Sequence, residues 1–212
     1  MRRTFARVDV DTPARNVRSV ATGLALRDVR GSGEVMKAID LRSYDEPALC
    51  KIVEWVLSPV FEIQREVCGK NLTDGEKVRI DFILHPKQSL RDRGFDAETV
   101  GIEVKSPSSK NVKQNAFAWQ SVTYSQSEFD GVRPDFVLMF PDVTFFWPET
   151  TAFSMQSFLQ YANVGMLLLG RDQHMARQRW CMKFGSTRYF SMDRGVSEQP
   201  NAATKRRWGN CS

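Results

Sequence analysis

Long hydrophobic runs are absent from this 212-residue sequence. The longest, Val164–Leu169, is far shorter than the roughly 18 residues of a membrane-spanning helix. The basic N-terminus is not followed by an apolar segment, which argues against a secretory signal. The four cysteines, Cys50, Cys68, Cys181 and Cys211, lack the paired spacing of a zinc site or a disulfide framework. We therefore expect a cytoplasmic protein with reduced thiols and no membrane association.

The absence of several well-known sequence motifs excludes particular classes of function. The sequence contains no internal repeat, no glycine-rich phosphate loop, no Gly-x-Ser-x-Gly nucleophile elbow and no helicase motif. Its 42% apolar and 26% charged residues are ordinary for a globular chain, and its length allows one α/β domain with extensions. The net charge of +5, from 30 Lys and Arg against 25 Asp and Glu, is compatible with nucleic acid without being specific for it.

Two short apolar, β-branched segments, 78–84 and 100–105, are typical of strands. A period of two divides the first into one face with Val78, Ile80, Phe82 and Leu84 and another with Arg79, Asp81, Ile83 and His85. In the second, Ile102 and Val104 oppose Glu103 and Lys105. If the strands are neighbours, Asp81, Glu103 and Lys105 converge on one surface. Two carboxylates and an amine on rigid strands could hold a divalent cation and a phosphate.

The order Asp81, then Glu103-x-Lys105, resembles the PD-(D/E)xK nuclease superfamily. Gln120 and Tyr124 match the QxxxY signature that follows the lysine in its RecB-type and phage-exonuclease branches. The resemblance covers roughly Glu46 to Phe140 and implies an α/β, restriction-endonuclease-like fold, with a mixed central β-sheet flanked by α-helices. It also implies that the two carboxylates bind Mg²⁺, for which Mn²⁺ can substitute, and that the lysine positions or activates the attacking water.

The same resemblance assigns further roles. The backbone carbonyl of Val104 is a third metal ligand, and the first helix contributes a glutamate, Glu54 or Glu46. Gln120 and Tyr124 hold the lysine, the water or a substrate phosphate. We expect the nucleic acid to contact three cations: Lys110, Lys113 and Arg79. A cross-strand ion pair of Asp81 with Lys105 is the structural alternative, worth about 0.2–1 kcal/mol, but it leaves Glu103 unexplained.

The remaining elements follow from periodicity and turn residues. Asp45 and Pro47 predict the start of a helix that ends before Pro59, and Asp74-Gly75 predicts a hairpin between strands 61–67 and 78–84. The charged stretch 86–98 is interpreted as a loop over the site. Further predicted elements are helices 110–126 and 150–161 and strands 135–140, 143–147, 164–169, 179–184 and 187–192. Residues 17–29 fit a strand or a short helix.

These observations predict a basic N-terminal extension (1–40), a nuclease domain (41–192) and a basic, flexible C-terminal tail (193–212). The expected function is Mg²⁺-dependent hydrolysis of DNA at ends or in single strands, by a phage or mobile-element protein acting in the host cytoplasm. The alternatives are an inactive nuclease-fold protein that binds nucleic acid, and an RNA endonuclease on the same fold. Expected partners are DNA, with RNA as the alternative, a second copy of the chain, or a separate helicase or replication protein.

Overall fold

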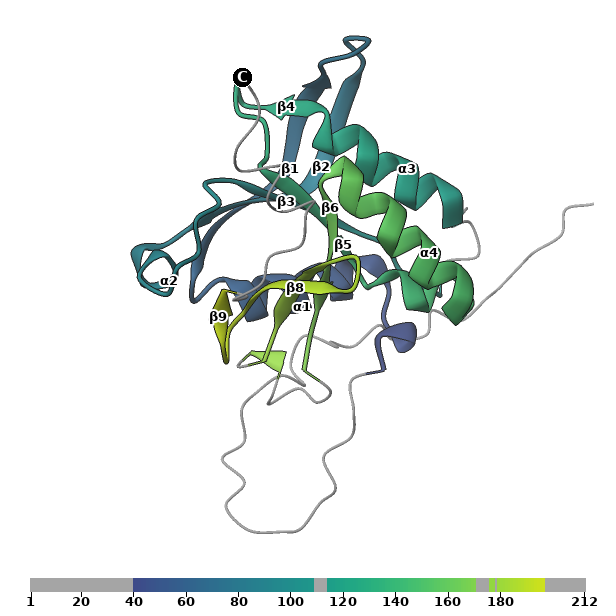
Figure 1. The fold of residues 1–212 in the computed structure, drawn as a ribbon. Helices are drawn as coiled ribbons and strands as arrows, with labels where there is room; N and C mark the ends of the chain where they lie inside the picture. Colours follow the sequence, from purple (N-terminus) through teal and green to yellow (C-terminus); the bar gives the residue numbers. More distant parts are fainter. Residues whose placement is uncertain (1–39, 109–113, 171–175, 178, 197–212) are drawn as a thin grey trace, which may run out of the picture. The chain divides into compact units, whose positions relative to one another are not determined.

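A mixed β-sheet organises the part of the chain that the structure, a computed structural model, describes: residues 40–108, 114–170, 176–177 and 179–196. Within these residues nine strands run in the order β4-β1-β2-β3-β5-β6-β7-β8-β9 (Figure 1). They are β1 (Phe61–Asn71), β2 (Lys77–Pro86), β3 (Val100–Val104), β4 (Ser127–Phe129), β5 (Phe136–Phe140), β6 (Val164–Leu168), β7 (Cys181–Phe184), β8 (Thr187–Ser191) and β9 (Gly195–Val196). β3, β5 and β6 are parallel neighbours, and the other pairs are antiparallel.

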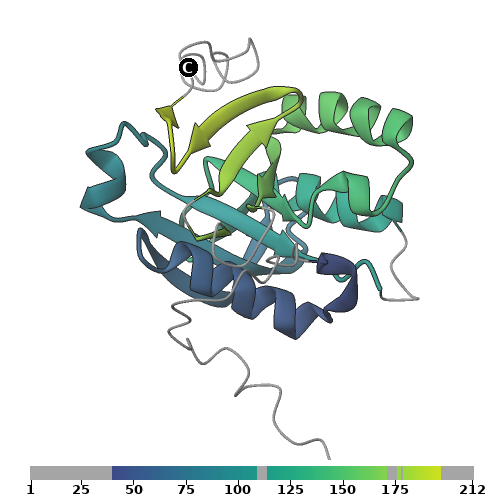
Figure 2. The ribbon, with the colours of Figure 1, turned by 90° about the horizontal axis from the view of Figure 1, so that it is seen from below.

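Helices cover both faces of the sheet. They are α1 (Glu46–Leu57), α2 (Gln88–Arg91), α3 (Gln114–Ser125) and α4 (Glu149–Leu159), with short 3-10 turns η2 (Leu41–Ser43), η3 (Val143–Phe145) and η4 (Gln160–Ala162). α1 packs Leu49 into one core cluster with Phe82, whereas α3 packs Phe117 into another with Met139. Figure 2 shows α1 on the side opposite α3 and α4. Strands β3 and β5 are buried throughout because both of their faces are covered.

The first helix and the first hairpin, α1 and β1–β2, form where the sequence predicts them. Asp45 caps α1 by accepting a hydrogen bond from the Ala48 N–H at 2.9 Å, and the helix ends at Leu57, ahead of Pro59. The predicted antiparallel hairpin of β1 and β2 is confirmed, with Gly75 in the turn at a φ of +77°.

Most of the later elements are also confirmed. The structure has the two buried strands β5 and β6, the C-terminal pair β7 and β8, and the helices α3 and α4. Residues 110–113 of the predicted helix 110–126 and the ambiguous segment 17–29 lie outside the described residues. The mixed sheet with helices on both faces confirms the α/β class.

Two predictions are wrong. Residues 143–147 form no strand; they contain η3, because the Asp142 carboxylate accepts a hydrogen bond from the Thr144 N–H at 2.7 Å and so favours a turn. The stretch 86–98 does not cover the site. It contains α2, buries Leu90, Phe95 and Ala97 in the core, and leads into the end of β3 that is remote from Lys105.

Two short edge strands were not predicted. β4 pairs with the end of β1, and β9 pairs with β8. β9 falls inside the predicted tail 193–212, whose residues from 197 onward lie outside the described part, as does the predicted extension up to residue 39. Among the described residues, no helix has the length and apolarity needed to cross a bilayer.

Candidate functional site

The β1–β2 hairpin changes the direction of its side chains at Asp81. Ile80 packs in the same cluster as Ile83 and Tyr124, whereas Phe82 packs in the cluster beneath α1. Ile80 also lies against Gly101, the residue that pairs with Ile83. The expected alternation, with Ile80 and Phe82 on one face, is therefore wrong here.

The cause is a backbone kink in the neighbouring strand. Glu66 has a φ of +51°, in the left-handed region that a non-glycine residue seldom adopts. The pairing of β1 with β2 runs from Arg65 with Phe82 to Val67 with Ile80 and skips the position of Glu66 and Asp81. Such an interruption re-aims side chains, and here it directs a carboxylate toward the end of β3.

The Asp81 side chain joins β2 to β3 beyond their last backbone pair. That pair is Phe82 with Ile102. One step further, the Asp81 Oδ2 atom accepts a hydrogen bond from the Val104 backbone N–H at 2.7 Å. The carboxylate is thereby fixed beside Glu103 and Lys105, so the three residues predicted to converge do so.

Glu103 is the most deeply buried charged group of the site. Its residue is 1% exposed, and its Oε1 atom lies 2.7 Å from the Lys105 Nζ. Its Oε2 atom is buried and has no hydrogen-bond partner. Burial raises the pKa of Glu103 to about 8, and the nearby Asp81 carboxylate raises it further, whereas Lys105 acts in the opposite direction. Because Oε2 has no hydrogen-bond donor and the Asp81 carboxylate lies close by, Lys105 alone does not balance the negative charge around Glu103.

Lys105 is held between two glutamates. Besides Glu103, its Nζ lies 3.5 Å from the Oε1 of Glu46, the first residue of α1. Burial alone would lower the pKa of Lys105, but the Glu103 carboxylate raises it above the usual lysine value, aided by the charges of Asp81 and Glu46. The amine is therefore cationic at neutral pH, which suits a charge stabiliser better than a general base.

Gln120 and Tyr124 lie at the flank of this site. The Gln120 Nε2 donates to the Tyr124 hydroxyl at 2.5 Å, and that hydroxyl donates to the Arg79 backbone carbonyl at 2.5 Å. Burial raises the pKa of Tyr124 to about 12, and the Glu103 charge adds to this rise. The two side chains form what we call the α3 latch: they attach α3 to β2 two residues before Asp81.

The other predicted site residues lie elsewhere or outside the described part. Glu54 pairs with Arg65 at 3.5 Å, so Glu46 is the α1 glutamate in contact with the site. The Arg79 side chain is exposed and pairs with Glu66 at 3.0 Å. Lys110 and Lys113 are not among the described residues. Sequence reasoning missed the role of Glu66, because the usual signal for a left-handed position is glycine or asparagine.

The donor set fits a hard divalent cation with few protein ligands. In the described part of the chain, no group of three or more His, Cys, Asp or Glu side chains is arranged to hold a metal ion. Mg²⁺ is commonly held by one or two carboxylates and completes its octahedron with waters and phosphate oxygens. Asp81 and Glu103 supply that pair, and the unpartnered Glu103 Oε2 has a free lone pair for it.

Comparison of the chain with family models, with curated proteins and with solved structures gave no match.

Proposed function

We propose that this protein is a divalent-metal-dependent nuclease with a restriction-endonuclease-like fold, which hydrolyses phosphodiester bonds in DNA. The observation that carries the proposal is the buried, unpartnered Oε2 of Glu103 beside Asp81 and Lys105. The ion pair with Lys105 satisfies only the Oε1 of Glu103 and leaves Oε2 buried beside the Asp81 carboxylate, an arrangement that is costly without a proton or a cation between the two carboxylates. A cation bound between the two carboxylates would satisfy it.

Asp81 and Glu103 would hold the ion, with the Val104 carbonyl as a further ligand. When bound, Mg²⁺ or Mn²⁺ would supply a water of lowered pKa and stabilise the negative charge that develops on the phosphate. Lys105, cationic and 21% exposed, is placed to bind a phosphate oxygen or to orient the attacking water. The α3 latch keeps the backbone of β2 in place behind Asp81.

DNA is the preferred substrate because the ordered residues Asp81, Glu103, Lys105, Gln120 and Tyr124 resemble the branch of the nuclease superfamily that processes DNA ends and single strands. A separate helicase or replication partner is part of the proposal because the sequence contains no helicase motif, and a host cytoplasmic setting is proposed from the small size of the chain and the lack of resemblance at its two ends. An RNA endonuclease would share this geometry, and the substrate panel below separates the two by their dependence on the 2′-OH.

The test is a cleavage assay with Mg²⁺ or Mn²⁺ on labelled single-stranded DNA, blunt duplex DNA, closed circular DNA and single-stranded RNA. Asp81→Asn is the inactive variant, and Glu62→Gln, an exposed carboxylate of β1, is the matched control. We expect cleavage by the wild type and Glu62→Gln and none by Asp81→Asn. Equal cleavage by all three would refute the site. Binding without cleavage of any substrate would identify an inactive nucleic-acid-binding protein.

Lys105 is tested by separating metal binding from turnover. Lys105→Ala removes the cation but leaves both carboxylates, so Mn²⁺ binding measured by calorimetry should persist while cleavage is lost. Cleavage at the wild-type rate by this variant would remove Lys105 from the mechanism. Loss of Mn²⁺ binding would instead show that Lys105 is needed to assemble the carboxylate pair.

A further inference from the structure

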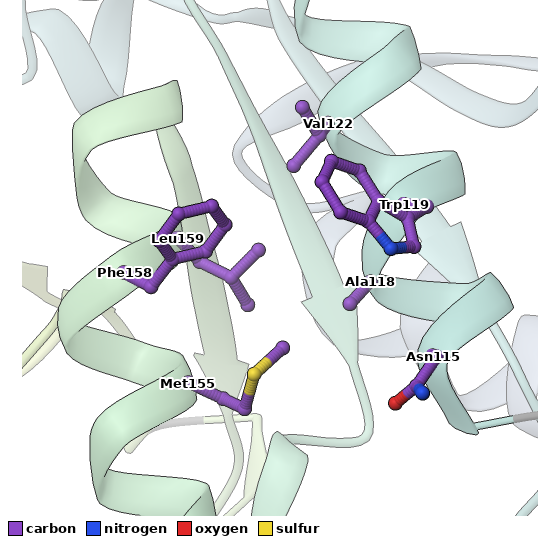
Figure 3. Close-up of a pocket in the computed structure, with 7 residues that line it drawn as sticks. All are labelled: Asn115, Ala118, Trp119, Val122, Met155, Phe158 and Leu159. Atoms are coloured by element: carbon purple, nitrogen blue, oxygen red, sulfur yellow. The ribbon is translucent and has the colours of Figure 1, made fainter.

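A groove of about 250 Å³ separates α3 from α4 (Figure 3). Its lining is almost entirely apolar: Ala118, Trp119, Val122, Met155, Phe158 and Leu159, with Asn115 as the polar member. Figure 3 shows Trp119 and Phe158 facing each other across the groove from the two helices, and their ring centroids are 6.4 Å apart in an edge-to-face arrangement. A groove of this size is smaller than the usual pocket for a small ligand.

The rim of the groove exposes large aromatic side chains. Trp119 is 61% exposed and Phe158 is 54% exposed. Since such side chains have areas of about 150–250 Å² each, the two together expose roughly 170–290 Å². Large exposed aromatic rings that face each other across an apolar groove are typical of interaction surfaces.

The same surface is depleted in charge. α3 contains no Asp, Glu, Lys or Arg, and α4 with η4 contains only Glu149. In the chain as a whole, 26% of residues are charged. Loss of charge together with exposed Trp and Phe side chains and a Met in the lining is typical of a protein interface core.

We propose that a second copy of this chain docks on this groove, with α3 and α4 of each copy packed against α3 and α4 of the other around a two-fold axis. In a two-fold contact a patch faces its own copy, so a charged patch would repel itself and an uncharged one is self-complementary. None of the residues that line the groove is a cation, which favours a protein over a nucleic acid as the occupant of the groove itself.

A subunit contributes about 800 Å² to a stable interface. The exposed parts of Trp119 and Phe158 supply roughly a quarter to a third of this area, and the facing surfaces of α3 and α4 would supply the rest. The groove lies between α3 and α4, and the proposal does not depend on the nuclease activity.

The experiment is sedimentation velocity on the full-length chain over a range of concentrations. Trp119→Glu places a charge on the patch, and Leu72→Glu, at a residue 54% exposed in the β1–β2 turn, is the matched control. We expect a concentration-dependent dimer for the wild type and for Leu72→Glu, and a monomer for Trp119→Glu. Thermal unfolding of each variant verifies that it is folded.

A mixing experiment keeps the test decisive if one variant is unstable. Phe158→Lys alone should also be monomeric, because its patch repels itself, whereas an equimolar mixture with Trp119→Glu should recover a dimer through opposite charges. A wild type that is monomeric at every concentration would overturn the proposal, as would a Trp119→Glu dimer as tight as the wild type. A monomeric wild type whose binding to single-stranded DNA needs Trp119 would assign the rings to base stacking instead.

Discussion

The Asp81 carboxylate accepts the Val104 backbone N–H at 2.7 Å, and this hydrogen bond continues the contact between β2 and β3 where their backbone pairing has ended. Asp81 therefore has a structural role and an electrostatic one in the same side chain. The two roles can be separated, because the amide oxygen of an asparagine can accept the same hydrogen bond but carries no negative charge.

Asp81→Asn should abolish metal-dependent cleavage and leave stability almost unchanged, because the Asn carbonyl oxygen can still accept the Val104 N–H. Asp81→Ala should lose cleavage and also about 1–3 kcal/mol of stability, since it leaves that N–H without a partner. Denaturant unfolding and the cleavage assay measure the two effects separately. Equal stability of the two variants would mean that the hydrogen bond contributes little.

Tyr124→Phe should destabilise the protein by about 1–3 kcal/mol and slow cleavage. It removes the donor to the Arg79 carbonyl while the ring stays packed edge-to-face on Phe129 at 5.9 Å. Tyr161→Phe, at a residue that is 70% exposed, is the control and should stay within about 0.5 kcal/mol of the wild type. Indistinguishable unfolding curves for both variants would show that the latch is dispensable.

Glu66→Gly should keep stability and cleavage near the wild-type level. Glycine adopts the left-handed φ of +51° without strain, which offsets the loss of an exposed ion pair with Arg79. Glu66→Val should cost about 1–3 kcal/mol and reduce cleavage, because a β-branched residue resists this conformation. Gln64→Val, in the same strand at ordinary φ, is the control. A Glu66→Val variant as stable as Glu66→Gly would mean that the kink is not required.

Metal binding should stabilise the protein more above pH 8 than well below it. Because the folded-state pKa of Glu103, about 8, is higher than the ordinary 4.5, the folded protein holds an extra proton between these values. The contribution of Glu103 to stability is thus fully present below pH 4.5 and is lost as the pH rises through 8. A bound cation has to displace that proton.

Thermal unfolding of the wild type with and without Mn²⁺, across pH, measures this linkage. Glu103→Gln, which cannot titrate, is the reference for both curves. Because the variant lacks this carboxylate, it should show neither the loss of stability between pH 4.5 and 8 nor the Mn²⁺-induced rise in melting temperature. A melting-temperature rise that is independent of pH would place the metal elsewhere.

The sequence was sufficient for the part of the site that depends on strand periodicity. Periodicity predicts Glu103 and Lys105 on one side of β3, and the apolar, β-branched runs predict that β2 and β3 are strands. That the two strands are neighbours was a condition of the prediction, and the structure meets it. Asp81 was grouped with them correctly, although the assumed continuous alternation from Val78 to Leu84 is broken at Asp81 itself. The pattern holds on each side of the kink, but not across it.

What the sequence could not reveal depends on contacts distant along the chain. No local signal marks Glu66 as left-handed, since its conformation is imposed by packing of both halves of the hairpin on different helices. Val143–Phe145 has the β propensity of a strand, yet the capping hydrogen bond that the Thr144 N–H donates to the Asp142 carboxylate outweighs it. Similarly, Leu90 and Phe95 made the stretch 86–98 part of the core despite its charge.

The α3 latch bonds to the main chain of residue 79 and makes no use of its side chain. Any amino acid there offers the same carbonyl oxygen to Tyr124, so the side chain at this position can change without loosening the helix. The charge at this edge of the sheet can therefore be altered, by nature or by design, while the carboxylates keep their geometry. If the protein is the nuclease proposed here, substitutions at Arg79 should change its affinity for nucleic acid separately from its rate of cleavage.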